Sequence, residues 1–168
     1  KTMSISFRSG NSLPSWKRMI RLDLEVDSTL VEFSWNLVQE VLGNLRQEPD
    51  ERFIPADADD PDFAEAWMDG LREALDRDFQ AITNLFTANR FGEEPVELKP
   101  EDAEGIIRAC SAVRLWLRNH RLEDVPDPSL ETGVVDLEAL KPEPRLAYFT
   151  YGLLAYLQES LIELLDGA

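Results

Sequence analysis

The chain has 168 residues, the length of one ordinary domain, and its 33 acidic side chains against 17 basic ones give a formal net charge of −16. This charge disfavours direct binding to nucleic acid, because neutralising phosphate groups requires an excess of Lys and Arg. A single cysteine excludes an internal disulfide, a single histidine excludes zinc motifs with two histidines, and no apolar run approaches the roughly eighteen residues that cross a membrane.

Residues 1–26 have the alternating pattern of β-strands. Apolar and polar residues alternate around Ile5 and again over residues 20–26, and the turn-forming sequence Ser9-Gly10-Asn11 lies between these stretches. This pattern predicts an N-terminal β-hairpin. The first 22 residues hold five basic side chains and no acidic one, so we expect the hairpin to lie on the acidic remainder of the chain.

A first helix is predicted from Ser28, where the apolar period becomes helical, with Asp27 or Ser28 as its N-cap and Pro49 beyond its end. The acidic connector over residues 48–65 lacks the glycine and glutamate positions of a calcium loop, so we expect no cation site there. The predicted core face of this helix consists of Leu30, Phe33, Leu37, Val41 and Leu45.

A second helix is predicted to begin after Asp60, because aspartate is a good N-cap and Pro61 suits the first helical position. An ion pair between Arg72 and Asp76, four residues apart, is expected on its surface. Its apolar stripe, the side that such a helix turns toward the core, consists of Phe63, Trp67, Leu71, Leu75, Ile82 and Phe86.

Pro100 opens a third predicted helix, with acidic residues in the first turn where the helix dipole favours them. Its only cysteine, Cys110, lies at a core position and is expected to act as a small buried hydrophobe. His120 lies near the end of the helix, where we expect a structural hydrogen bond. The predicted core face consists of Ile106, Cys110, Val113 and Leu117.

Three arginines, Arg114, Arg118 and Arg121, follow one edge of that core face. Guanidinium groups suit both carboxylates of neighbouring helices and a bound anion. We favour pairing with acids inside the bundle, and we expect Arg114 to be largely buried against a carboxylate, with Glu159 as the candidate.

A proline-rich link leads to a last helix, predicted over residues 145–166. Leu146, Phe149, Leu153, Leu157 and Leu164 lie on one side of it, whereas Tyr148, Tyr151 and Ile162 lie nearly opposite. This second apolar side requires cover from a second copy of the chain, from a partner protein, or from the link at residues 125–144. We expect a partner protein.

These elements predict a mainly α fold, a bundle of about four main helices preceded by an N-terminal β-hairpin. We expect a single domain over residues 1–168, with the hairpin arm at residues 1–26 and the helical bundle at residues 28–166. The residues suggest no cofactor and no metal, and the cytoplasm is the expected location.

Two segments have the character of family motifs. One runs from Cys110 to Leu117 (CSAVRLWL) and is followed by Arg121 and Leu122, and the other runs from Tyr151 to Leu161 (YGLLAYLQESL). Together with the connector at residues 54–61, they resemble a bacterial family, the domain of unknown function DUF2017. The resemblance extends over residues 28–166, and the second segment, which contains Gln158 and Glu159, is its most specific part.

The resemblance implies a helical cytoplasmic protein without established catalytic residues, and some members of the family are described as transcriptional regulators. This chain departs from the family pattern at Ser111 and Ala112, where the arginine motif has Asn and Asp. Its single cysteine also excludes the internal disulfide of a redox-responsive switch.

The residues and the resemblance together predict a non-enzymatic bacterial regulatory or adaptor protein that binds another protein, one with a basic surface. No nucleophile with a partnering base supports an enzyme. The alternative is a receptor for a small molecule or anion in an arginine-lined pocket of the bundle, and a homodimer is also compatible with the pattern. The candidate interaction residues are Arg114, Arg118, Arg121, Tyr148, Tyr151, Gln158 and Glu159.

Overall fold

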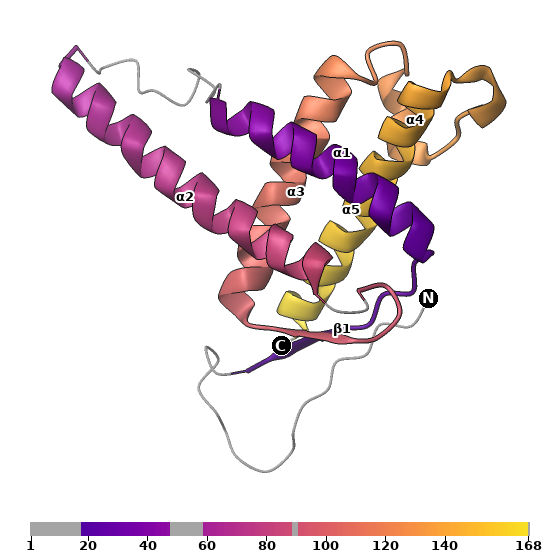
Figure 1. Ribbon diagram of the computed structural model, residues 1–168, viewed down its shortest axis with the longest axis horizontal. Coiled ribbons are helices and arrows are strands. Elements are labelled where there is room, and N and C mark those ends of the chain that lie inside the picture. Colours follow the sequence, from indigo (N-terminus) through magenta and orange to yellow (C-terminus); the bar gives the residue numbers. More distant parts are fainter. Residues whose placement is uncertain (1–17, 48–58, 89–90, 168) are drawn as a thin grey trace.

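The computed structural model describes residues 18–47, 59–88 and 91–167, and within them four long helices confirm the predicted mainly helical bundle. Figure 1 shows α1 crossing in front of α3 and α5, while the first half of α2 extends away from the other helices. In chain order, the elements are β1 (Ile20–Leu22), α1 (Ser28–Gln47), α2 (Pro61–Thr87), β2 (Val96–Leu98), α3 (Pro100–His120), α4 (Asp127–Thr132), the 3-10 helix η3 (Leu137–Ala139) and α5 (Pro142–Asp166).

The strand predicted near Ile20 is present as β1, which buries Ile20 and Leu22 and exposes Arg21. Its described partner is β2, which runs antiparallel to it and places Leu98 opposite Ile20. The other strand of the predicted hairpin and its turn lie outside the described residues. Alternation within one segment indicates a strand but not its neighbour, so the sequence does not predict the pairing with β2, which lies far along the chain.

Side chains and prolines at the helix starts explain where the helices begin. The Asp27 carboxylate accepts a hydrogen bond from the amide of Thr29 at 2.8 Å, and Asp60 caps α2 as predicted. The last helix begins at Pro142, three residues before the predicted start at Arg145. Prolines are compatible with this first turn, because its backbone N–H groups have no partner within the helix.

The core of the molecule is built around α3. All four residues predicted to form its core face are buried, and α3 packs against both α2 and α5. The approach to α2 is close at Gly105, where an added Cβ would lie 3.1 Å from Oδ1 of Asp78. We call the buried side of this helix the α3 core face: Ile106, Cys110, Val113 and Leu117.

Two aromatic residues predicted for the core are on the surface. Phe33 of α1 is 55% exposed and Phe149 of α5 is 38% exposed. The buried side of α1 is rotated relative to the predicted one and includes Ser34, whose hydroxyl accepts a hydrogen bond from Thr150 of α5 at 3.2 Å. Small hydroxyl residues that satisfy each other let α1 and α5 approach, so the larger phenylalanines lie outside this contact.

The surface ion pair predicted within α2 is also different. Arg72 contacts Asp69, one turn before it, at 3.4 Å. Asp76 instead contacts Arg46 at the end of α1, at 3.3 Å. The choice of partner was open at the sequence level because Arg72 has acids at both helical spacings and because α1 was not placed beside α2.

A bidentate ion pair joins α2 to α3 at the edge of the core. Nε and Nη2 of Arg108 donate to the two carboxylate oxygens of Asp78, each at 2.9 Å, and Asp78 is buried. The hydrogen bond to Asp78 raises the pKa of Arg108 above its ordinary value. The charge of Arg108 therefore compensates a carboxylate that is largely removed from water.

The substitution Arg108→Ala should lower the free energy of unfolding by about 1–3 kcal/mol, because it leaves the buried carboxylate of Asp78 without its partner. Thermal denaturation followed by circular dichroism should show a melting temperature several degrees lower. The matched control is Arg72→Ala, which removes an exposed pair worth no more than about 0.5 kcal/mol. Equal melting temperatures for the two variants would contradict the structural role of Arg108.

Candidate functional site

The three arginines predicted as candidate binding residues lie along the last turns of α3 and just beyond its end. In the structure, each of them contacts a different set of residues. Arg114 contacts α5, Arg118 contacts α4, and Arg121 contacts both α1 and α5. The arginines therefore connect helices and do not converge on one point.

Arg114 is held by neutral side chains. Its Nη1 donates to Oε1 of Gln158 at 2.7 Å and its Nη2 donates to the hydroxyl of Tyr151 at 3.1 Å. The guanidinium carbon lies 4.6 Å from the centre of the Tyr151 ring, a cation–π contact. Its Nε is buried without a hydrogen-bond partner. Arg114 is thus half-buried and bonded, but its contacts are with an amide and an aromatic ring.

The predicted partner of Arg114 was Glu159, and this prediction is wrong by one residue. Glu159 is exposed, whereas Gln158 lies on the side of α5 that faces α3. Successive residues of a helix point about 100° apart, so a neighbouring position meets a different environment. The amide of Gln158 also donates to the Ile107 carbonyl at 3.2 Å and to the Ser111 hydroxyl, which a carboxylate would not do.

Arg118 joins α3 to α4. Its Nε donates to Oδ1 of Asp127 at 3.0 Å, and its Nη2 forms an ion pair with the other carboxylate oxygen. This hydrogen bond raises the pKa of Arg118 above its ordinary value. Both side chains are exposed, so the pair positions α4 without contributing much to stability.

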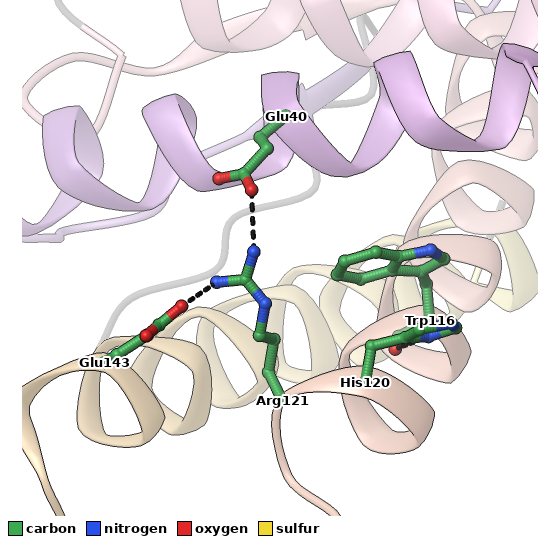
Figure 2. A network of polar contacts seen from close by, with 5 residues as sticks. All are labelled: Glu40, Trp116, His120, Arg121 and Glu143. Carbon is green, nitrogen blue, oxygen red and sulfur yellow. Dashed lines mark hydrogen bonds and ion pairs between the residues drawn. The ribbon is translucent and has the colours of Figure 1, made fainter.

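Arg121 connects three helices, as Figure 2 shows. Its Nη2 donates to Oε1 of Glu40 on α1 at 2.6 Å, and its Nη1 donates to Glu143 in the first turn of α5. The guanidinium also lies over the Trp116 ring, 5.6 Å from its centre. One cation is thereby shared between two carboxylates, and it fixes α1 against α3 and α5.

His120 has a structural environment of the kind predicted for it. Its Nδ1 is 2.9 Å from the Trp116 carbonyl oxygen, and the two rings stack with their centres 4.3 Å apart (Figure 2). A general base needs an orienting group on one nitrogen and a substrate at the other. The orienting group here is a backbone carbonyl in its own helix, an arrangement typical of a packed histidine.

The two tyrosines on the second apolar side of α5 contact other parts of the chain, whereas Ile162 is exposed. The Tyr148 hydroxyl donates to the carbonyl oxygen of Gly133 at 3.0 Å, in the link between α3 and α5. Tyr151 is occupied by Arg114 of α3. Gly133 has φ +72°, a left-handed conformation that ends α4 and turns the link toward Tyr148. Of the three covers considered for this side, the link is thus the one in contact with Tyr148.

The largest departure from the predicted surface is in α2. Its buried residues begin at Asp78, and Phe63 and Trp67 near its start are 49% and 42% exposed, although both were assigned to the core stripe. Their rings are 6.2 Å apart. We call residues 61–75 the projecting half of α2, because Figure 1 shows this part extending beyond the other helices.

A signal for this exposure was present in the helix lengths. α2 has 27 residues, whereas α1 has 20 and α3 has 21. At a rise of 1.5 Å per residue, α2 is about 10 Å longer than either neighbour, so part of its stripe extends past them. Periodicity alone identified the stripe but not how much of it is covered.

The part of the chain that the structure describes has neither a candidate metal site nor a candidate membrane-spanning helix. No group of three His, Cys, Asp or Glu side chains there is arranged to hold a metal ion. No helix there combines the length and the apolar character needed to cross a membrane.

Replacing Arg121 with alanine should lower the free energy of unfolding by about 1–2 kcal/mol, because two carboxylates on different helices lose their shared cation. Urea denaturation in about 0.05 M and about 1 M salt should show the difference from the wild type narrowing at the higher concentration, since salt screens half-exposed charges. Arg118→Ala is the control, with a loss of no more than about 0.5 kcal/mol. A loss for Arg118→Ala as large as that for Arg121→Ala would contradict this assignment.

Burial raises the pKa of the Cys110 thiol from 9.0 to about 12, and the nearby charge of Arg114 opposes this effect only in part. The folded protein should therefore not react with a thiol reagent at pH 8, and unfolding in urea should expose one reactive thiol. The pKa of the thiol is higher in the folded state than in the unfolded state, so ionisation of the thiol favours unfolding. The contribution of the neutral thiol to the free energy of unfolding is therefore complete below about pH 9 and is lost as the pH rises toward 12. Urea denaturation of the wild type and of Cys110→Ala between about pH 7 and pH 10.5 measures it, and identical pH profiles would contradict the burial of the thiol.

The family of the chain follows from a comparison with family models. The model of a domain of unknown function, DUF2017, matches residues 35–165, which include α3, all but the last residue of α5, and the contacts between Arg114, Tyr151 and Gln158. No curated protein and no solved structure matches the chain. The chain belongs to the DUF2017 family.

Proposed function

We propose that this protein is a non-enzymatic regulatory or adaptor protein of the bacterial cytoplasm that binds another protein through the projecting half of α2. The observation that carries the proposal is the pair of exposed aromatic rings, Phe63 and Trp67, on a helix that extends beyond the bundle. Large apolar side chains grouped on a surface and surrounded by polar residues are typical of protein interfaces.

This proposal moves the interaction surface from α5 to α2. The sequence favoured Tyr148 and Tyr151 as interface residues because they lie on the second apolar side of α5. In the structure, the Tyr148 hydroxyl donates to Gly133, and Tyr151 contacts Arg114. Partial burial and internal hydrogen bonds reduce what these tyrosines offer to a partner, whereas Phe63 and Trp67 keep much of their apolar area in solvent.

The environments of the reactive side chains also favour a binding role over an enzymatic one. Cys110 is buried within the α3 core face, and burial raises the pKa of its thiol to about 12. His120 is stacked on Trp116 and bonded to a carbonyl of its own helix. A catalytic nucleophile needs access to a substrate and a low pKa, and Cys110 has neither.

The arginine contacts give little support to the alternative, a receptor for an anion. Arg118 and Arg121 already form ion pairs with Asp127, Glu40 and Glu143. An incoming anion would have to displace these carboxylates, and it would approach a chain of net charge −16. We therefore assign the arginines to the assembly of the bundle.

Site-specific photo-crosslinking in the native bacterium tests the proposal. A chain with p-benzoylphenylalanine in place of Phe63 should form a discrete cross-linked product with one partner protein, because this ring lies on the proposed surface. The matched control carries the same crosslinker in place of Phe33, an equally exposed phenylalanine on α1. Products of the same mass and yield at both positions, or products at position 33 alone, would contradict the proposal.

A further inference from the structure

The apolar stripe of α2 continues without interruption from the bundle into its projecting half. Within the bundle, the residues of the stripe are fully buried, and toward the start of the helix they become half-buried and then exposed. The spacing stays at four or seven residues throughout, which keeps all of them on one side of the helix. In order from the exposed end, the stripe consists of Phe63, Trp67, Leu71, Leu75, Ile82 and Phe86.

This continuity indicates what kind of element fits the projecting half. In the bundle, the same stripe meets another helix at Phe86, whose ring stacks on Trp35 of α1 with the ring centres 5.2 Å apart. A second helix can follow side chains at a spacing of four residues by placing its own side chains between them, whereas a strand presents side chains at a period of two. The projecting half therefore has the geometry of one half of a helix pair.

The length of the projecting half sets the size of the occupant. An ion pair joins α2 to α1 at Asp76, whose Oδ1 is 3.3 Å from Nε of Arg46. Residues 61–75 before it form about four helical turns, or roughly 22 Å. A partner helix of about fifteen residues would cover this length, and helices of that size dock on apolar surfaces through a few spaced anchors.

The charge of the projecting half determines which helix fits. Residues 61–75 have four acidic side chains and one basic one, a local charge of −3. The exposed acids include Asp62, Glu65 and Glu73, on the sides of the helix away from the stripe. A helix that carries Lys and Arg beside its apolar residues is attracted to this surface, and a second copy of α2 brings the same negative charge and is repelled.

We propose that the occupant of the projecting half of α2 is a basic amphipathic α-helix of the partner protein. It lies along α2, with its apolar side on Phe63, Trp67 and Leu71, and its Lys and Arg side chains are attracted by the acids on the other sides of α2. The inference rests on the proposed function, since it specifies the partner of the same surface. Apolar contact supplies most of the affinity, and charge selects among helices and speeds association.

The test uses the full chain and two synthetic, fluorescently labelled eighteen-residue peptides, designed with the same leucine stripe and with either Lys or Glu at the remaining positions. Fluorescence anisotropy should show the Lys peptide binding to the wild type, with an affinity that falls several-fold between about 0.05 M and about 0.5 M salt. The Glu peptide should bind at least about tenfold more weakly.

Variants of the protein locate the binding site. Phe63→Ala combined with Trp67→Ala should weaken binding of the Lys peptide at least about tenfold, as expected when two aromatic anchors are removed. Phe33→Ala should leave the affinity within about twofold, because Phe33 is exposed on a different helix. Thermal denaturation of all variants confirms that each is folded under the conditions of the assay.

Three results would overturn the inference. The first is equal binding of the two peptides, and the second is a similar loss of affinity for Phe33→Ala and for the double variant. The third is a dimer of the wild type in analytical ultracentrifugation that becomes a monomer in the double variant, which would make a second copy the occupant.

The two proposals fail in different ways. If the crosslinker at position 63 captures a partner in the bacterium but the Lys peptide does not bind, the basic helix is wrong and the protein-binding function remains. If position 63 yields no cross-linked product, the proposed function fails and the inference about its partner fails with it.

Discussion

The burial of α3 on two sides is the interaction on which the rest of the structure depends. The α3 core face is fully buried, and Gly105 lets α2 approach until there is little room for a side chain. Once α3 is held in this way, the polar residues along its edge point toward α4, α5 and α1, where Arg118, Arg114 and Arg121 find their partners. The contacts of the arginines are therefore a consequence of how the core is packed.

Local chemistry explains what was predictable from the sequence. The sequence correctly predicts each residue of the α3 core face, because the apolar residues of this buried helix recur clearly at helical spacing. The capping role of Asp60 was also predictable, since an aspartate before a proline satisfies an amide that has no partner within the helix. The sequence is compatible with three covers for Tyr148, namely the link, a partner protein and a second copy of the chain. No property of the tyrosine itself distinguishes among them, and in the structure the link contacts it.

What could not be predicted depends on distances between elements. The pairing of β1 with β2 joins segments far apart in the chain, and the exposure of Phe63 depends on where α1 ends beside α2. The partner of Arg114 was misassigned because Gln158 and Glu159 differ by one position, and only the rotation of α5 about its axis decides which one faces α3. Periodicity determines which residues share a side of a helix, but not how the helix is turned or how far its cover extends.

The buried hydroxyl pair between Ser34 and Thr150 has a consequence for the alignment of α1 with α5. An apolar contact of the same size is satisfied in several alignments, because one methyl group packs against another almost equally well after a shift along the helix. A hydroxyl pair inside the core is satisfied in one alignment, and any sliding leaves two polar groups without partners. Two side chains that add little to stability thereby select a single register among several of similar energy.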